Sequence, residues 1–425
     1  MVYDLIVIGG GPAGMMAAGR TGERGGRVLL LEKNPRLGVK LAITGKGRCN
    51  LTNAEPEIKK FIANYGVNGK FLFSAMSRFD NFDVIDFFEQ RGVKTKVERG
   101  QRVFPESDQS RDVNEALLEY LRDNKVAVRT KAAVKELAIR NKRIEKVVLL
   151  GQEELAAKNY LIATGGQSYP GTGSNGDGYD WLKRLGHKIV EPRPALAPIV
   201  LRENWIQELE GLSLKNVAIS VWQNKKKIDN RFGEALFTRH GMSGPIILDM
   251  SKKIGELLAL ASGPVELMID FKPALNEKIL DERLRKDFAA QINKMFKNSL
   301  TWLLPQKMIP VIIRLSGISG NKKVNAITRI ERQKLSKLLK SFPLTVKAVG
   351  GWETAIITAG GVDLREVDPK TMHSKIIENL YFAGEILDID GPTGGFNLQI
   401  CWSTGFAAAE GIILNHNLPT PASPR

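Results

Sequence analysis

The residues of this chain best suited to chemistry begin with the glycine run "GGGPAG" at positions 9–14, which fits the spacing G-x-G-x-x-G. In that pattern Gly9 permits a tight turn, Gly11 lets the backbone approach a pyrophosphate, and Gly14 lets a helix pack close to a strand. A helix that starts at this turn presents free N–H groups and the positive end of its dipole to phosphates. The chemistry to expect here is the binding of a dinucleotide.

The elements that must position this turn are present in the right order. The apolar run "DLIVI" (4–8) predicts a buried parallel strand, and "PAGMMAAGRTGERG" (12–25) predicts an amphipathic helix. A second buried strand, "RVLLLEKN" (27–34), carries Glu32 at its end. An acid at that place accepts hydrogen bonds from a ribose hydroxyl, which favours an unphosphorylated ribose, as in FAD or NAD.

Two downstream segments favour FAD over NAD. "KNYLIATGG" (158–166) and "NLYFAGEILDIDG" (379–391) each predict a strand that ends in glycine, the second at Gly384–Glu385. FAD-binding folds use such strand ends along the cofactor, although each alone could be an ordinary strand-to-loop glycine. The chain has no second complete G-x-G-x-x-G unit, so no separate NAD(P) domain is expected.

The segment "GPTGGFNLQICWSTGFAAAEGI" (391–412) predicts a helix that begins around Phe396–Gln399. Its N-terminus offers backbone donors and a positive dipole end. In flavoproteins of this type such a helix faces the flavin C2 carbonyl, where negative charge develops on reduction.

The polar stretch "AITGKGRCNLTN" (42–53) follows soon after Glu32. Its glycines could let the backbone pass close to the isoalloxazine ring, while Arg48 and the amides bind the ribityl chain, the pyrophosphate or a substrate carboxylate. The alternative is a structural loop with solvated charges. Cys49 and Cys401 lie in flavin-side motifs, but without a Cys-x-x-Cys they fit two buried small residues better than a redox pair.

Length and composition describe an ordinary soluble chain. Its 425 residues suggest two or three domains, and 43% are hydrophobic. No apolar run is long enough for a transmembrane helix, and the N-terminus lacks the basic region of a signal peptide. With only two cysteines, a cytoplasmic location is expected.

The formal net charge of +16 admits nucleic acid, an anionic membrane or an acidic ligand as partner. The densest basic cluster, "QNKKKIDNR" (223–231), fits a hairpin turn. Lysines spread over solvated faces are the favoured interpretation, so neither a specific nucleic acid nor a membrane is expected. A small-molecule substrate is expected, and the oligomeric state stays open.

Several long motifs give the chain a family resemblance. The segment "TGSNGDG" resembles a stretch of the fumarate reductase and succinate dehydrogenase flavoproteins. Nearly the whole chain resembles the bacterial FAD-dependent oxidoreductases described as aminoacetone oxidase-like or as NAD(P)/FAD-dependent flavoproteins of the bile-acid pathway. The most distinctive matches are "LLLEKNPRLGVKLAITGKGRCNLTN", "YLIATGGQSYPGTGSNGDGYDWLKRLGH" and "LYFAGEILDIDGPTGGFNLQICWSTG".

The resemblance implies an α/β fold: a Rossmann-like FAD-binding domain like those of glutathione reductase and fumarate reductase, interrupted by a β-barrel-like domain that holds a small helical subdomain. The expected boundaries are 1–193 with 354–425 for the FAD domain, 194–272 with 342–353 for the β-rich domain, and 273–341 for the helical insert. The sequence agrees, since strand-like runs fill 194–271 and helix formers fill 273–341.

Catalytic residues are less defined. The family pattern F-T-H-x-G-x-S-G-P here reads "FTRHGMSGP", with the histidine displaced by one place to His240. His240, Tyr169 and Arg48 are weak candidates for acid–base or substrate-binding roles. The four scattered histidines lack ligand spacing, so no metal site is expected.

The motifs and the resemblance together assign one set of residues to non-covalently bound FAD: Gly9, Gly11, Pro12, Ala13, Gly14, Glu32, Lys33, Lys40, Thr44, Gly45, Gly47, Arg48, Cys49, Asn50, Val134, Ala163, Thr164, Gly165, Gly384, Glu385, Gly395, Phe396, Asn397 and Leu398. The expected function is hydride transfer between flavin N5 and a small organic substrate. Oxygen could accept the electrons, or NAD(P)H could act as a transient reductant. The alternatives are an RNA-binding flavoprotein related to tRNA-modifying enzymes and a flavin-stabilised scaffold without turnover.

Overall fold

The computed structural model describes residues 2–415 and divides the chain into two compact units. The first unit comprises residues 1–194 and 352–425, and the second comprises residues 195–351. Each unit has its own cluster of buried hydrophobic side chains. The chain therefore builds two separate cores.

A five-stranded parallel sheet forms the centre of the first unit, in the order β19-β10-β1-β2-β6. The strands pair in parallel, so their carboxyl ends lie at one edge of the sheet. Hydrophobic runs make these strands because both faces are covered, and the last four residues of β1 are fully buried. The strands are β1 (Tyr3–Ile8), β2 (Val28–Leu31), β6 (Ala127–Arg129), β10 (Ala157–Ile162) and β19 (Leu380–Phe382).

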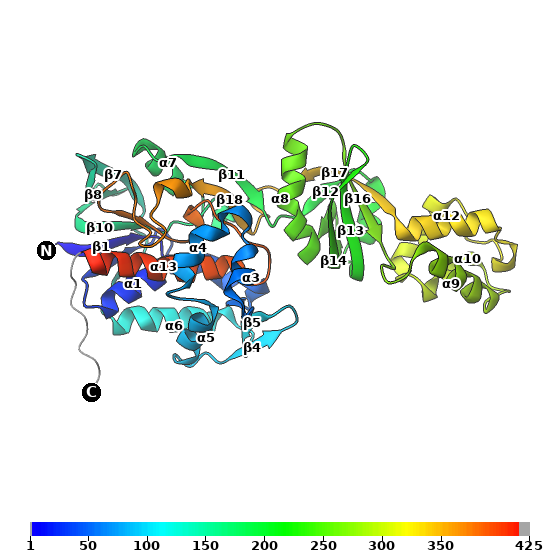
Figure 1. Ribbon diagram of the computed structural model, residues 1–425, viewed down its shortest axis with the longest axis horizontal. Helices are drawn as coiled ribbons and strands as arrows, with labels where there is room; N and C mark the ends of the chain where they lie inside the picture. The colour runs from blue at the N-terminus through cyan, green and yellow to red at the C-terminus, as the bar shows by residue number, and fades with distance from the viewer. Residues whose placement is uncertain (1, 416–425) are drawn as a thin grey trace. The chain divides into compact units, whose positions relative to one another are not determined.

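Helices cover this sheet, and α1 lies beside α13 along much of its length (Figure 1). Small residues allow this close approach, because a Cβ at Gly405 of α13 would lie 2.6 Å from the carbonyl oxygen of Ala13. The helices of the unit are α1 (Pro12–Glu23), α2 (Val39–Ile43), α3 (Ile58–Ala63), α4 (Gly69–Met76), α5 (Asn81–Glu89), α6 (Ser110–Asp123), α7 (Asp177–Arg184) and α13 (Phe396–Asn415).

Three small sheets complete the first unit, in the orders β3-β5-β4, β7-β8-β9 and β11-β18. Their strands are β3 (Thr52–Asn53), β4 (Thr95–Glu98), β5 (Arg102–Pro105), β7 (Val134–Arg140), β8 (Arg143–Leu149), β9 (Glu154–Leu155), β11 (Ile189–Ala195) and β18 (Ile357–Val362). The first of these sheets holds the segment that follows "AITGKGRCN".

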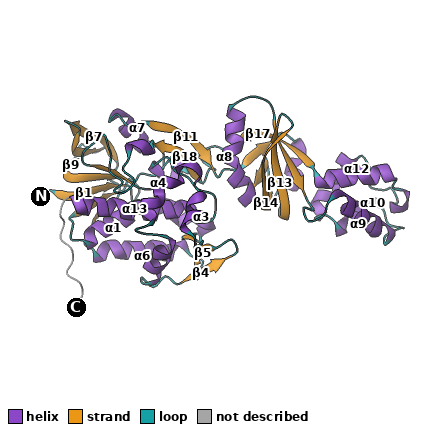
Figure 2. Ribbon diagram, viewed as in Figure 1, coloured by secondary structure: helices purple, strands orange, loops and turns teal. Residues whose placement is uncertain are grey.

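The second unit contains a closed barrel of six strands in the order β12-β15-β14-β13-β16-β17 (Figure 2). Strand β16 alternates buried and partly exposed residues throughout its length. The basic cluster at 223–231 forms the predicted hairpin between β13 and β14. The bounds are β12 (Ile199–Leu201), β13 (Ser213–Gln223), β14 (Lys226–Thr238), β15 (Gly241–Ser243), β16 (Val265–Asp270) and β17 (Phe342–Val349), with helix α8 (Pro245–Ala259).

A group of helices follows β16 within the same unit: α9 (Glu277–Ala289), α10 (Phe296–Ser299), α11 (Ile309–Ser316) and α12 (Arg329–Lys340). Helix α12 starts at a capping box, in which Thr328 and Glu331 each satisfy a backbone N–H of the first turn. The parallel sheet, the barrel and these helices confirm the predicted fold class. No helix in residues 2–415 is long and apolar enough to cross a membrane.

Candidate functional site

The glycine turn starts at the edge of the central sheet where the carboxyl ends of the parallel strands meet. A Cβ at Gly9 or Gly14 would overlap backbone, since it would meet the carbonyl of Ala163 or of Gly9 itself. At Gly11, by contrast, a Cβ would meet no atom within 4 Å. Gly11 is the N-cap of α1. The turn therefore leaves open space at the N-terminus of α1, where a pyrophosphate would bind.

Two backbone N–H groups hold the carboxylate of Glu32 at the end of β2. Gly10 donates to Oε2 and Asn34 donates to Oε1, each at 2.8 Å. Glu32 is only 9% exposed. Its carboxylate is thus fixed beside the glycine turn, where a ribose hydroxyl would meet it.

The side chain of Lys33 binds the glycine-rich loop at residues 165–176. Its Nζ donates to Asn175 at 2.6 Å and to Asp177 at 2.8 Å. Asn34 reinforces this connection by donating to the carbonyl of Thr172. The sequence offers no local signal for these partners, because they lie more than 130 residues away.

The stretch 44–49 has an unusual backbone. Gly45, Lys46, Gly47 and Cys49 all have positive φ, at 58°, 61°, 85° and 60°. Glycine adopts this region freely, whereas residues with a Cβ pay a steric penalty there. The conformation of this loop therefore favours glycine at positions 45 and 47, although Lys46 and Cys49 adopt the same region.

Hydrogen bonds connect the end of this loop with the start of α13. Asn50 fits with its side-chain oxygen 3.0 Å from the N–H of Gly395. Thr52 Oγ1 donates to Gln399 Oε1 at 2.6 Å in a buried position. A Cβ at Gly395 would overlap the backbone of Thr52. The two segments that the sequence assigns to the flavin thus lie against each other, although they are more than 340 residues apart.

Arg48 has a structural task that its sequence position does not reveal. Its guanidinium donates to Glu98 at 2.6 Å and to Asp108 at 2.9 Å. It also lies 3.9 Å from the ring centroid of Phe104. Two carboxylates and an aromatic face occupy the group, so Arg48 anchors the loop to β4, β5 and the segment after β5.

Lys40 and Glu385 meet in a polar cluster with Ser168 and Thr358. Lys40 Nζ lies 2.7 Å from both Glu385 Oε2 and Ser168 Oγ. Glu385 Oε1 accepts from Ser168 Oγ at 2.9 Å and from the Thr358 N–H at 2.7 Å. The side chains of Lys40 and Glu385 are 20% and 17% exposed. Sequence reasoning found the lysine and the glutamate but missed Ser168 and Thr358.

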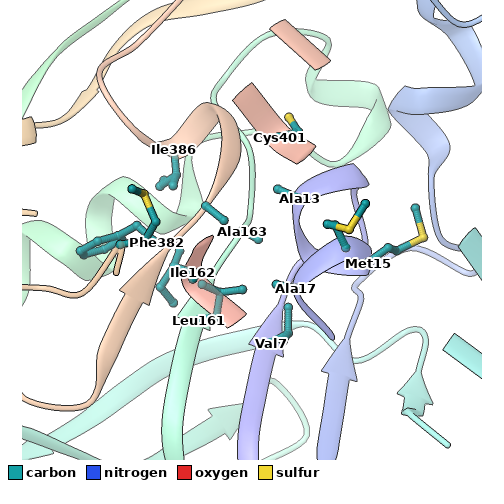
Figure 3. Close-up of a cluster of buried hydrophobic side chains, with 14 of the residues drawn as sticks. Val7, Ala13, Met15, Ala17, Leu161, Ile162, Ala163, Phe382, Ile386 and Cys401 are labelled. Atoms are coloured by element: carbon teal, nitrogen blue, oxygen red, sulfur yellow. The ribbon is translucent and has the colours of Figure 1, made fainter. Parts of the chain in front are cut away.

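Small side chains line the place where α1, the end of β10 and α13 approach one another. Figure 3 shows Ala13, Ala163 and Cys401 at this meeting point. A Cβ at Gly384 (φ 79°) would come within 2.8 Å of the Ala13 methyl and 3.4 Å of the Cys401 sulfur. Burial raises the pKa of Cys401, and likewise of Cys49, to about 12. Both are free thiols, and neither is a thiolate near neutral pH.

The remaining candidates have different surroundings. Tyr169 is half-buried in the first unit, with its N–H bonded to the carbonyl of Trp352. His240 belongs to the second unit, where its side chain is exposed in the turn between β14 and β15. Thr164 Oγ1 is buried, has no hydrogen-bond partner in the described part of the chain, and faces Gly178 of α7.

The other assigned residues are held by backbone structure. Pro12 and Ala13 form the first turn of α1, and Phe396, Asn397 and Leu398 form the first turn of α13. Thr44 Oγ1 donates to the carbonyl of Leu41, Val134 begins β7, and Gly165 has a φ of 73°. Within residues 2–415 no group of three or more His, Cys, Asp or Glu side chains could hold a metal ion.

These features fit FAD. The open space at Gly11, the fixed Glu32 carboxylate and the N-termini of α1 and α13 match the phosphates, the ribose and the flavin ring of that cofactor. The fold and the site define an FAD-dependent oxidoreductase. The family described as "HI0933-like protein Rossmann domain" matches residues 3–411, and the chain belongs to that family. The resemblance drawn from the motifs is thereby confirmed.

The chain is similar over its length to two curated relatives of different activity. A 3-dehydro-bile acid delta(4,6)-reductase of Clostridium scindens is 29% identical over 95% of this chain and 97% of its own. A ribosomal RNA dihydrouridine synthase of Haemophilus influenzae is 29% identical over 96% of this chain and 98% of its own.

Among solved structures, a 3-ketosteroid delta1-dehydrogenase of Sterolibacterium denitrificans matches with a TM-score of 0.55 at 15% identity, over 97% of this chain and 100% of that one. A flavocytochrome c3 fumarate reductase matches with a TM-score of 0.53 at 15% identity, over 97% and 78% of the two chains. Such distant likeness supports the fold alone.

Proposed function

We propose that the protein reduces a carbon–carbon double bond conjugated to a carbonyl group of a small organic substrate. The reductase and the dihydrouridine synthase that resemble it differ in substrate but share this reaction type. A delta(4,6) double-bond system in a 3-keto steroid is conjugated to the ketone, and the double bond lost when uridine becomes dihydrouridine is conjugated to a ring carbonyl. Both relatives match over nearly their full length, and the names of both imply reduction of a conjugated double bond. They therefore support the reaction class and leave the substrate open.

The observation that carries the proposal is the cluster of Lys40, Ser168 and Glu385. Reduction of a conjugated double bond adds a hydride to one carbon and a proton to the other. FAD, when bound and reduced, would supply the hydride, with NADH or NADPH as the source of its electrons. Lys40 Nζ holds three N–H bonds, is one-fifth exposed, and is oriented by Ser168 Oγ and Glu385 Oε2 at 2.7 Å each. We assign it the proton that the second carbon receives.

The other residues bind and orient. The α1 N-terminus and the space at Gly11 hold the pyrophosphate, and Glu32 holds a ribose. The N-terminus of α13 would offer a positive dipole end to the flavin, which gains negative charge on reduction. Asn50 and Thr52 fix that helix start against the loop at residues 44–49. These groups would hold FAD by hydrogen bonds and electrostatic attraction, in agreement with the non-covalent binding expected from the sequence.

Separated half-reactions test the proposal. Under anaerobic conditions NADH or NADPH should bleach the visible flavin band, and a 3-keto-4,6-diene steroid or a simple cyclic enone should restore it and gain two hydrogens. Reoxidation by none of a panel of conjugated carbonyls, together with bleaching by aminoacetone or other amines, would show an oxidase instead. Protein that purified colourless and gained no flavin band with added FAD would refute the cofactor as well.

The variant Lys40→Met examines the proton donor. It should slow reoxidation by the enone at least tenfold while leaving reduction by NADPH and the bound FAD content unchanged. Lys60→Met is the matched control, because Lys60 lies on the exposed face of α3, where its ion-pair partner is Glu57. Equal slowing of both half-reactions in Lys40→Met would indicate that Lys40 supports cofactor binding only.

A uracil base in RNA is a second candidate substrate. The +16 net charge favours a polyanion, and the relatives in Haemophilus influenzae and in Escherichia coli carry the name ribosomal RNA dihydrouridine synthase. Incubation of the reduced holoenzyme with ribosomal RNA transcripts, followed by mass spectrometry of nucleosides, would detect dihydrouridine. Its absence under conditions that reduce a small enone would favour the small-molecule substrate.

A further inference from the structure

The positive charge of this protein is concentrated in one part of the chain. Residues 273–341 contain fifteen Lys or Arg and five Asp or Glu, which gives +10 of the total +16. Between residues 288 and 330 there are seven Lys or Arg and no acidic residue. This segment therefore carries most of the net positive charge of the chain.

Backbone pairing gathers three lysines of this region. The segment around Lys294 and Lys297 pairs with the segment around Lys323: the Val324 N–H donates to the Lys294 carbonyl at 3.0 Å, and Met295 and Lys323 are bridge partners. All three lysines are exposed, and none forms an ion pair in the part of the chain that the structure describes. Three exposed lysines thus lie on two paired backbone segments.

An exposed aromatic ring accompanies the lysines. Trp302 is 54% exposed, and Lys294 Nζ lies 5.6 Å from its ring centroid. Met295 and Ile292 are also exposed, at 42% and 53%. We call this surface the Trp302 patch; its members are Ile292, Lys294, Met295, Lys297, Trp302 and Lys323.

We propose that the Trp302 patch binds single-stranded RNA. Lysines that track a phosphate backbone beside an exposed ring on which a base can stack are the recurring elements of single-strand binding surfaces. The 43-residue stretch has no acidic residue of its own, which lowers the repulsion that a polyanion would meet; the carboxylates that contact it, Glu208 and Glu331, are each paired with a basic residue. Binding to a lipid surface would favour an amphipathic helix with a broad apolar face. Here the exposed apolar side chains come from short, separate segments, and Trp302 ends a single 3₁₀ turn.

The inference concerns the second candidate substrate, RNA. It rests on the proposed function in one respect only, namely that a base of the RNA is reduced. Binding is measured on oxidised holoprotein without NAD(P)H, where no turnover occurs. If the protein binds RNA but forms no dihydrouridine, the proposed reaction on RNA is wrong and the Trp302 patch remains an RNA-binding surface. If variants that lack the lysines of the Trp302 patch still form dihydrouridine, the patch is not the surface that binds the RNA.

The decisive experiment compares two triple variants of equal charge. Fluorescence anisotropy with a labelled single-stranded RNA at physiological salt measures affinity for the FAD-loaded protein. Lys294→Ala/Lys297→Ala/Lys323→Ala should weaken binding at least tenfold and lower the salt slope by about 2, since each lost contact to a single strand contributes roughly 0.7. The control removes three exposed lysines of the β13–β14 hairpin, Lys225→Ala/Lys226→Ala/Lys227→Ala, and should change affinity less than about twofold.

Equal losses in the two triple variants would overturn the proposal, because net charge alone would then explain binding. An absence of binding by the unchanged protein at physiological salt would overturn it too. Vesicles of phosphatidylserine and phosphatidylcholine that bind through the same three lysines, as tightly as RNA does, would make the patch a membrane site instead.

Trp302 provides a test that does not depend on charge. Trp302→Leu should weaken RNA binding about tenfold, whereas Trp302→Phe, which keeps a stacking face, should stay within about threefold of the unchanged protein. The ring is largely exposed, so both variants should keep their thermal stability and FAD content. Equal effects of the two variants on RNA affinity would overturn the stacking role.

Discussion

Two glycine-rich segments of the first unit, residues 9–14 and residues 44–49, need glycine for different reasons. In the first, Gly9 and Gly14 lie so close to neighbouring backbone that an added Cβ would overlap it. In the second, a Cβ at Gly47 would meet nothing within 4 Å, but φ is 85°. Packing is thus the constraint at Gly14, packing and a φ of 112° act together at Gly9, and conformation is the constraint at Gly47.

The difference determines how each segment responds to substitution. Overlap with main chain cannot be relieved without moving a strand or a helix. A side chain in place of Gly9 or Gly14 should therefore disrupt the whole turn. Some residues, such as asparagine, tolerate positive φ. The size of the effect in the second segment should therefore depend on which residue replaces glycine. Substitutions at matched positions can separate these two behaviours.

The largest effect is expected for Gly14→Ala. The new methyl would overlap the carbonyl of Gly9, so α1 would have to move away from β1. We expect a loss of roughly 3 kcal/mol or more of unfolding free energy and no bound FAD. Chemical unfolding and the ratio of flavin to protein absorbance measure the two effects.

Gly11→Ala is the matched control, because its methyl would enter open space and its φ of −83° suits any residue. The fold should keep its stability while FAD binding weakens, since the methyl occupies the place of the pyrophosphate. A Gly14→Ala protein that folds and binds FAD normally would refute the packing account. Unchanged FAD affinity in Gly11→Ala would place the pyrophosphate elsewhere.

A smaller, graded effect is expected in the second segment. Gly47→Val and Gly45→Val force a β-branched residue into positive φ, which costs about 1–2 kcal/mol and should lower FAD occupancy. Gly47→Asn should retain most of the bound FAD, because asparagine tolerates this region. Full flavin retention in both valine variants would return the loop to a purely structural role.

Local rules explain what could be predicted from the sequence. The strand–turn–helix–strand order around Gly9 and Glu32, and the helix that starts at Phe396, follow from hydrophobic periodicity and glycine spacing within short windows. The hairpin at residues 223–231 also depends on neighbours in sequence. These elements needed no information about distant partners.

The partners of charged residues could not be predicted in the same way. The motif around Arg48 predicts a ligand, yet the carboxylate partners of Arg48, Glu98 and Asp108, lie 50 and 60 residues away. Ser168 joins Lys40 across 128 residues, and Glu385 does so across 345. Such pairs depend on how strands and loops are brought together, which no single-sequence periodicity encodes.

Arg48→Ala should have a moderate effect on the second segment. It removes two ion pairs and the contact with Phe104, and because these groups are partly exposed the loss should be about 1 kcal/mol of stability. FAD occupancy should remain near that of the unchanged protein, as measured by flavin absorbance. Glu98→Gln provides the control, since it breaks one of the same pairs.

A tenfold weaker FAD or substrate affinity in Arg48→Ala, with unchanged stability and with Glu98→Gln behaving normally, would contradict the anchoring role. It would make Arg48 a direct ligand, as its motif first suggested. The first segment would then be constrained by packing, and the second by a direct contact between Arg48 and the ligand.

The smallest effect concerns the two thiols, Cys49 at the end of the second segment and Cys401 in α13. Burial raises both pKa values to about 12, from an ordinary value near 9. In the unfolded chain the thiols ionise first, so the stability they contribute is full below pH 9 and is lost as pH rises toward 12. By pH 9 the loss is about 0.4 kcal/mol for each thiol, and Cys49→Ala/Cys401→Ala should show a flatter profile.

Labelling with a thiol reagent at mildly alkaline pH compares the two sites directly. Both cysteines should react only after unfolding in urea, because both are buried and protonated in the native protein. The single variants Cys49→Ala and Cys401→Ala assign the rates. Rapid labelling of Cys49 while Cys401 stays protected would show that the loop at residues 44–49 opens in solution. The second segment would then be held by its conformation only part of the time, in contrast to the packed turn at residues 9–14.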